Sequence, residues 1–267
     1  ISGADGNTGV GVDVFEALTT GDNNVAIGLD ALTANSTGSN NTAVGKNALD
    51  ANTTASSNNA FGAASLTSNT TGTQNVAMGV SALEANTEGD NNVSIGNNSL
   101  SVNTTASDNT AVGHNALVAN TTGQENVAIG ANAGDANTTG NNNTFVGRDA
   151  GTANTTAGNN TFIGERAGAA NTTGDESVAV GQFAYAANTT GVDNVAIGRS
   201  ALSSNTTANN NVAVGRSALL SNTTGASQTG IGFQALYSAT TAGNNTALGH
   251  NALFNTTTGD DNTGVGK

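Results

Sequence analysis

The chain has 267 residues, a net charge of −13, only six Lys and Arg residues, and neither Cys nor Pro. Without Cys, disulfides and thiolate metal sites are excluded, and so few basic residues exclude the basic footprint of a nucleic-acid-binding protein. No apolar run approaches the roughly 20 residues of a membrane-spanning helix, so we expect no nucleic-acid partner and no membrane span in this chain.

A glycine recurs every 17 residues without a slip, from Gly11 to Gly266, sixteen times in all. Each copy is numbered here from this anchor glycine, which is position 0. The consensus has Asn-(Val/Thr)-Ala-(Ile/Val)-Gly at positions −4 to 0, Ala-Leu at +3 and +4, and Asn-Thr-Thr-Gly at +7 to +10. A fixed short period is typical of a solenoid. The scarcity of aromatic residues agrees, because each coil can bury small residues against its neighbours.

We therefore predict an all-β protein, a parallel β-solenoid (β-roll) with 17 residues per coil and about 16 coils. Residues 1–267 would form a single repeat domain. Within each copy, the β-branched and small residues at −3 to −1 predict a short strand, and +3 to +6 (31–34 in one copy) predict a second. The Asn-Thr-Thr-Gly and x-Asn-Asn segments predict the bends, since Gly and Asn tolerate a left-handed backbone.

One local exchange indicates which positions share the core. Leu at +4 is replaced by Gly134, Gly151 and Gly168 in three consecutive copies, where −2 becomes Phe145 and Phe162. Tightly packed interiors require such compensation of volume, so −2 and +4 are expected inside the coil. Strand alternation then places −1 and −3 on the outer face. In the alternative interpretation, −1 points inward and the exchange is a coincidence.

If −1 lies outside, its apolar row is not expected to face water and predicts an interface between copies of the chain. The candidate self-association row comprises Ile27, Val44, Ile95, Ile129, Val146, Ile163, Ile197 and Ile231.

Asparagine fills −4 in fourteen of sixteen copies and +7 in twelve. Stacked amides can bond along the solenoid and to the backbone of the bends. The +7 residues followed by x-Ser/Thr are also N-glycosylation sequons, which gives a second interpretation, with O-linked sugar on the Thr rows as a third. The candidate glycosylation residues are Asn35, Asn52, Asn69, Asn103, Asn120, Asn137, Asn154, Asn171, Asn188, Asn205 and Asn222.

Ten of the nineteen acidic residues lie at +11 or +12. Carboxylates could form a loose calcium-binding edge, but they do not recur on every copy, so a plain acidic edge is favoured over structural calcium and no cofactor is expected. The two histidines, His114 and His250, are eight copies apart at +1 and cannot share a site. No catalytic constellation is present, and we expect no enzymatic activity.

Thr or Ser fills +8 and +9 in nearly every copy, as in Thr19-Thr20 and Thr257-Thr258. Regular Thr rows resemble those of ice-binding faces. Adjacent residues of an extended strand point to opposite sides, however, so the spacing disfavours a flat Thr face.

The motif Asn-x-(Val/Thr)-Ala-(Ile/Val)-Gly, followed by a stretch of small residues, resembles the head repeats of trimeric autotransporter adhesins and similar repeats of bacterial and phage fibres. The resemblance covers essentially the whole chain. It implies a left-handed parallel β-roll, usually three rolls side by side, on a cell surface. The adhesin repeat is shorter than 17 residues, and the extra residues here fall in the Asn-Thr-Thr-Gly bend.

Two features of the ends bear on assembly. The chain opens at Ile1 without Met, as expected of a trimmed or partial protein. Residues 1–7 align with +7 to −4 of a copy and Lys267 directly follows Gly266. Because neither end carries the polar cap that solenoids need, we expect further protein or another copy to cover each end.

The most consistent function is that of a structural fibre or adhesin shaft, extracellular or at the cell surface, built by self-association of copies into a trimer or fibre. The alternatives are an adhesin head that binds a carbohydrate or a host or abiotic surface, and an ice-binding protein. A head should carry an irregular, aromatic-bearing insert, which this sequence lacks.

Overall fold

A computed structural model describes residues 3–267; Ile1 and Ser2, part of the expected open first coil, lie outside the described residues. The described chain contains sixteen three-residue strands, no helix, and one strand in every 17 residues. The predicted parallel β-solenoid is thereby confirmed. The chain divides into two compact units, described separately below: an N-terminal unit ending at Asn132 and a C-terminal unit, Ala133–Lys267.

Each unit holds eight strands. The N-terminal unit contains β1 (Thr8–Val10), β2 (Val25–Ile27), β3 (Thr42–Val44), β4 (Asn59–Phe61), β5 (Val76–Met78), β6 (Val93–Ile95), β7 (Thr110–Val112) and β8 (Val127–Ile129). The C-terminal unit contains β9 (Thr144–Val146), β10 (Thr161–Ile163), β11 (Val178–Val180), β12 (Val195–Ile197), β13 (Val212–Val214), β14 (Thr229–Ile231), β15 (Thr246–Leu248) and β16 (Thr263–Val265).

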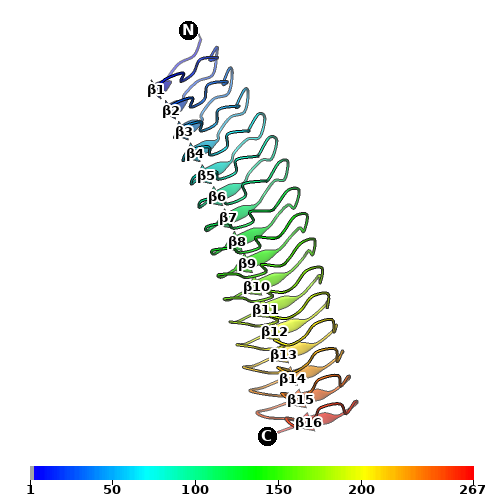
Figure 1. The fold of residues 1–267 in the computed structure, drawn as a ribbon. Helices are drawn as coiled ribbons and strands as arrows, with labels where there is room; N and C mark the ends of the chain where they lie inside the picture. Colours follow the sequence, from blue (N-terminus) through cyan, green and yellow to red (C-terminus); the bar gives the residue numbers. More distant parts are fainter. Residues whose placement is uncertain (1–2) are drawn as a thin grey trace. The chain divides into compact units, whose positions relative to one another are not determined.

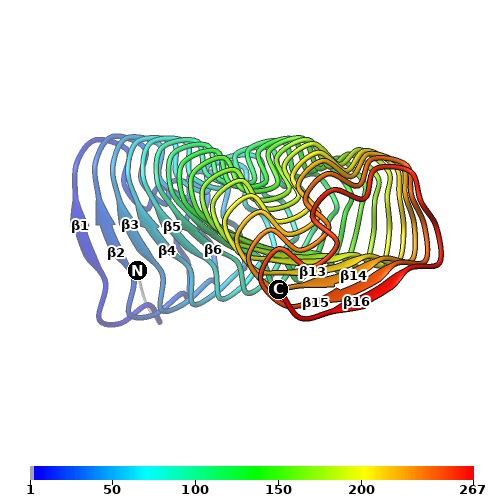
Figure 2. The same ribbon diagram turned by 90° about the horizontal axis from the view of Figure 1, so that it is seen from below.

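Within each unit every strand pairs in parallel with the strand of the next coil, in sequence order (Figure 1). The register is set by the repeat, so that Ala196 of β12 lies beside Ala213 of β13. A strand of three residues cannot stand alone, and the ladder to its neighbours supplies its stability. Viewed from below, the strands lie on one side of each coil and the rest of the coil closes without strands (Figure 2).

The anchor glycine is required by both conformation and space. Gly198 has a φ of +128°, and a Cβ there would lie 2.7 Å from the carbonyl carbon of Gly215 in the next coil. Any other residue would force neighbouring coils apart and strain the backbone, which explains why this position never varies.

The core lies where the Gly/Phe exchange placed it. Ala26 at −2, Ala31 at +3 and Leu32 at +4 are all fully buried. A Cβ on Gly151 would lie 2.4 Å from Cδ1 of the buried Phe145, so the phenyl ring occupies the space vacated by leucine. The same holds for Gly168 and Phe162. The alternative interpretation, with −1 pointing inward, is wrong.

The second strand predicted at +3 to +6 is also wrong, because this segment consists of turns. The amide of Ala48 donates to the carbonyl of Gly45 at 3.3 Å, and the amide of Asn52 donates to the carbonyl of Leu49 at 3.2 Å. Asn47 and Leu49 have φ angles of +59° and +51°. Adjacent residues of a strand point to opposite sides, whereas Ala48 and Leu49 both point inward, so only a turn satisfies the pattern.

Two rows of buried asparagines hold the bends together. At +7, Nδ2 of Asn69 donates to Oδ1 of Asn52 in the preceding coil at 3.0 Å and to the Gly72 carbonyl at 2.9 Å. At −4, Nδ2 of Asn58 donates to the same Gly72 carbonyl at 2.8 Å. Both amide ladders therefore converge on the carbonyl at +10, and buried polar groups that would otherwise be unsatisfied are paired.

Candidate functional surface

In each unit, the outer face of the strands carries a continuous apolar row at −1. Its isoleucines are exposed, with Ile197 39% accessible, while the valines that alternate with them are half-buried. The exposure alternates because of side-chain size: isoleucine has one more methylene group than valine and extends farther from the sheet into solvent. Every residue of the candidate self-association row lies on this face: Ile27, Val44, Ile95 and Ile129 in the N-terminal unit, and Val146, Ile163, Ile197 and Ile231 in the C-terminal unit.

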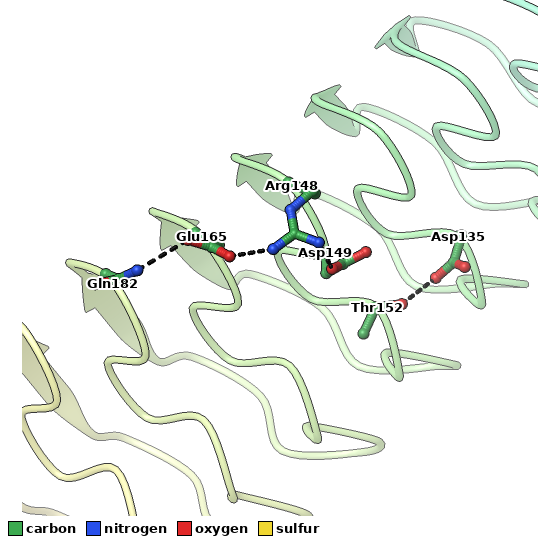
Figure 3. A network of polar contacts seen from close by, with 6 residues as sticks. All are labelled: Asp135, Arg148, Asp149, Thr152, Glu165 and Gln182. Carbon is green, nitrogen blue, oxygen red and sulfur yellow. Dashed lines mark hydrogen bonds and ion pairs between the residues drawn. The ribbon is translucent and has the colours of Figure 1, made fainter.

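Next to this row lies the edge formed by +1, which follows the strand and its anchor glycine. In the C-terminal unit Arg148, Glu165 and Gln182 follow one another there, each beyond the end of its strand (Figure 3). Arg148 forms ion pairs with Glu165 and with Asp149, the latter at 3.3 Å. The hydrogen bond from Gln182, together with Arg148, holds the pKa of Glu165 below its usual value. These groups are exposed, so the network adds little to stability.

The acidic residues at +11 have a structural role that the sequence analysis missed. Oδ1 of Asp175 accepts a hydrogen bond from the backbone amide of Gly158, the +11 residue of the preceding coil, at 2.7 Å. Asp260 does the same for Gly243 at 2.7 Å, and serine replaces aspartate in this role at Ser39 and Ser56. The +12 acids, such as Asp108 and Asp193, have positive φ angles, which Asp adopts more readily than most residues.

These acidic residues do not gather into a metal site in the described part of the chain. No group of three or more His, Asp or Glu side chains among residues 3–267 could hold a metal ion. The histidines are likewise far apart in sequence and exposed; His250 stacks on Phe233 of the preceding coil, with ring centroids 5.0 Å apart.

The candidate glycosylation residues at +7 are interior side chains. All eleven asparagines have no accessible surface. A glycan would be attached to Nδ2. In each of these residues Nδ2 donates a hydrogen bond to the +10 carbonyl of the same coil, as in Asn35 and Gly38. The folded coil leaves no room for sugar there, and the amide ladder that the same repetition predicted is what these side chains form.

The two threonine rows have different environments. At +8 the hydroxyl donates to the backbone carbonyl of the same position in the next coil, as Thr189 Oγ1 does to the Thr206 carbonyl at 3.0 Å. At +9 the side chains, such as Thr190 and Thr207, are exposed. The bends thus present one exposed Thr row, and the other is used internally.

A compensating pair of substitutions also went unnoticed in the sequence. Ser177 replaces the −4 asparagine whose amide would reach the Gly191 carbonyl, and the hydroxyl of Tyr185 donates to that carbonyl instead, at 2.8 Å. Asn194 Nδ2 in turn donates to the Tyr185 hydroxyl at 2.6 Å. The sequence does show that Ser177 departs from the Asn consensus at −4 and that Tyr185, half a coil later, departs from the Leu consensus at +4. The two departures can be linked only when it is known that the −4 and +4 side chains meet in the interior.

Comparisons with protein-family models and with curated proteins find no match for this chain. Among the described residues, no helix is long and apolar enough to cross a membrane. The surface of the solenoid is therefore the feature that bears on function.

Proposed function

We propose that the protein is a structural shaft, of an extracellular fibre or a surface adhesin, and that its copies associate through the outer face of the strands. The observation that carries the proposal is the exposed isoleucine row at −1. Contiguous exposed apolar surface is uncommon on monomeric proteins and marks interaction sites. The resemblance of the repeat to trimeric autotransporter adhesin heads supports the same function.

The physical basis is a division of tasks between the two faces of each strand. The inner face is small and closely packed, with Ala196 and Leu202 fully buried. The outer face is apolar but has no partner within its own coil. Burial of the outer face against another copy would stabilise the assembly by the hydrophobic effect, without any chemical step.

The test is the oligomeric state of charged variants of the row. We expect Ile129→Asp, in the N-terminal unit, and Ile197→Asp, in the C-terminal unit, each to raise the dissociation constant more than about tenfold, because an unpaired charge buried at an interface costs several kcal/mol. Sedimentation velocity over a range of concentrations measures this directly.

The matched control is Thr207→Asp, which adds the same charge at the exposed +9 row of a bend. It should leave association unchanged, and circular dichroism should show that all variants remain folded. A wild-type chain that stays monomeric at high concentration would overturn the proposal, as would equal effects of Ile197→Asp and Thr207→Asp.

A further inference from the structure

The distribution of basic residues is the most uneven feature of the surface. All six Lys and Arg residues lie at +1 or +2 of their coils, just beyond a strand: Lys46, Arg148, Arg166, Arg199, Arg216 and Lys267. Five of the six belong to the C-terminal unit. The chain as a whole is acidic, with a net charge of −13, so basic residues gathered at one place suit an anionic ligand. We propose that the +1 row at the C-terminal end of the C-terminal unit binds an acidic polysaccharide, carboxylated or sulfated.

The binding strip is defined as five successive +1 residues, all exposed: Arg199, Arg216, Phe233, His250 and Lys267. No acidic residue occupies +1, +2 or +5 between Arg199 and Lys267. Among the described residues, neither Arg199 nor Arg216 forms an ion pair with a carboxylate, whereas Arg148 on the same row is neutralised by Asp149 and Glu165. The strip therefore offers cations whose charge is not already compensated by neighbours.

The solenoid places these side chains in a regular row. Arg216 lies 5.9 Å from the centroid of the Phe233 ring, and Phe233 stacks on His250 at 5.0 Å. Consecutive side chains are thus separated by about one strand spacing, roughly 4.8 Å. A linear polymer that repeats its acidic groups can follow such a row, and guanidinium groups bind carboxylate and sulfate oxygens in a bidentate geometry.

A second aromatic pair lies in the same two coils. Tyr237 and Phe254, at +5 of the coils that hold Phe233 and His250, are half-buried and stacked at 4.9 Å with an interplanar angle of 8°. Rows +5 and +2 are neighbours in this repeat, since Thr67 Oγ1 at +5 donates to the Asn47 carbonyl at +2 of the preceding coil. Each of these rings stacks face to face on its partner in the next coil, so the rings expose mainly their edges, which form an apolar surface beside the cations.

A nucleic acid is the less suitable polyanion, because single strands bind by stacking their bases on exposed aromatic faces, and the faces of Phe233 and His250 are stacked on each other. The acidic edge of another copy is the other competing occupant. The polysaccharide is favoured because its acidic groups repeat along the whole length of the strip, whereas the acidic residues at +11 and +12 do not recur in every coil.

The experiment measures binding of the full chain to heparin, polygalacturonate, neutral dextran and a single-stranded oligonucleotide by titration calorimetry at low salt. Heparin and polygalacturonate separate sulfate from carboxylate recognition. We expect at least one of them to bind, dextran not to bind, and the Arg199→Gln/Arg216→Gln variant to bind at least about tenfold more weakly, as loss of charged hydrogen bonds predicts.

Arg148→Gln is the matched control, because it removes a charge from the same row where that charge is already paired; it should change the affinity less than about twofold. The proposal is overturned if neither acidic polysaccharide binds, if Arg148→Gln weakens binding as much as an Arg199→Gln single variant, or if the oligonucleotide binds as tightly as the polysaccharides. It is also overturned if the arginine variants alter self-association but not polysaccharide binding.

Discussion

At the scale of single residues, the coil places Leu in a backbone conformation that most residues avoid. Leu202 at +4 has a φ of +51°, and a left-handed conformation costs roughly 1–2 kcal/mol for a residue with a Cβ. Complete burial of its side chain offsets that cost. At Gly151 and Gly168 the glycine is free of this strain, while Phe145 and Phe162 supply the lost volume.

Phe162→Ala should therefore destabilise the protein by about 3–5 kcal/mol, the usual cost of truncating a buried phenylalanine. Gly168→Leu in the wild type should also destabilise, because a Cβ there would lie 2.4 Å from Phe162 Cδ2. Together the two changes restore the common pattern and should recover much of the loss. Urea denaturation measures each variant, and Leu29→Ala, at the exposed +1 position of the N-terminal unit, is the control that should cost little.

The second residue-scale prediction concerns Ser177 and Tyr185, which compensate each other. Ser177→Asn alone should be destabilising, since the Tyr185 hydroxyl already donates to the Gly191 carbonyl, and Tyr185→Leu alone should leave that buried carbonyl without this donor. Each should cost about 1–3 kcal/mol. In the double variant the introduced asparagine side chain would donate to the Gly191 carbonyl, and stability should return. Additive losses in a double-mutant cycle would contradict the coupling.

Tyr185 also predicts a pH dependence. Burial raises the pKa of Tyr185 to about 12, whereas an unfolded tyrosine ionises near pH 10. The folded chain therefore keeps the proton where the unfolded chain loses it. The contribution of Tyr185 to stability should be constant below about pH 10 and should fall between about pH 10 and 12, by up to about 3 kcal/mol.

Denaturation at a series of alkaline pH values checks this. Tyr185→Phe should flatten the plot of stability against pH. The control is Tyr237→Phe, at a half-buried tyrosine of the same unit, which should leave the plot as steep as in the wild type. Groups common to all three proteins cancel in the comparison. Identical slopes in wild type and Tyr185→Phe would show that the Tyr185 phenol is not responsible.

At the scale of the coil, the sequence predicts the strand and its register but not the closing turns. The anchor glycine and the alternation at −3 to −1 are compatible with only one structure, a short strand in a fixed register. The Ala-Leu segment does not, because short apolar runs fit a strand as well as a turn. A turn is required because two adjacent residues, Ala31 and Leu32, are both buried. The Gly/Phe exchange predicted the burial of the Leu position but gave no information on the Ala position.

The amide ladder is the element on which neighbouring coils depend most. Asn69 donates to Asn52 and Gly72 and accepts from Asn86 at 2.9 Å. Asn69→Ala removes all three hydrogen bonds and leaves the buried Oδ1 of Asn52 without its donor, so we expect a loss of about 3 kcal/mol. Thr71→Ala, at the exposed +9 position of the same bend, is the control and should stay within about 0.5 kcal/mol. Equal effects in urea denaturation would mean that the ladder contributes nothing specific.

At the scale of the molecule, charge is sorted by row in a way that composition conceals. The totals exclude a basic protein, yet they do not reveal that every Lys and Arg lies at +1 or +2 and that ten of the nineteen acidic residues lie at +11 or +12. The apolar row was recognisable from the repeat alone. The cation–aromatic strip was not, because Arg216, Phe233 and His250 become neighbours only when successive coils stack.

The two proposed activities differ in their response to salt, and this gives the last prediction. Association through the isoleucine row brings together chains that each carry a net charge of −13, so their mutual repulsion opposes it. Raising the salt from about 0.05 to 0.5 M shortens the screening length from more than 10 Å to less than 5 Å, and association should strengthen. Binding of heparin or polygalacturonate to the strip is attraction between opposite charges, so it should weaken over the same range. Sedimentation velocity and titration calorimetry on one preparation measure both. If salt instead causes the copies to dissociate, charged contacts rather than the apolar row hold them together. An apolar interface contains no charge–charge attraction that salt could screen.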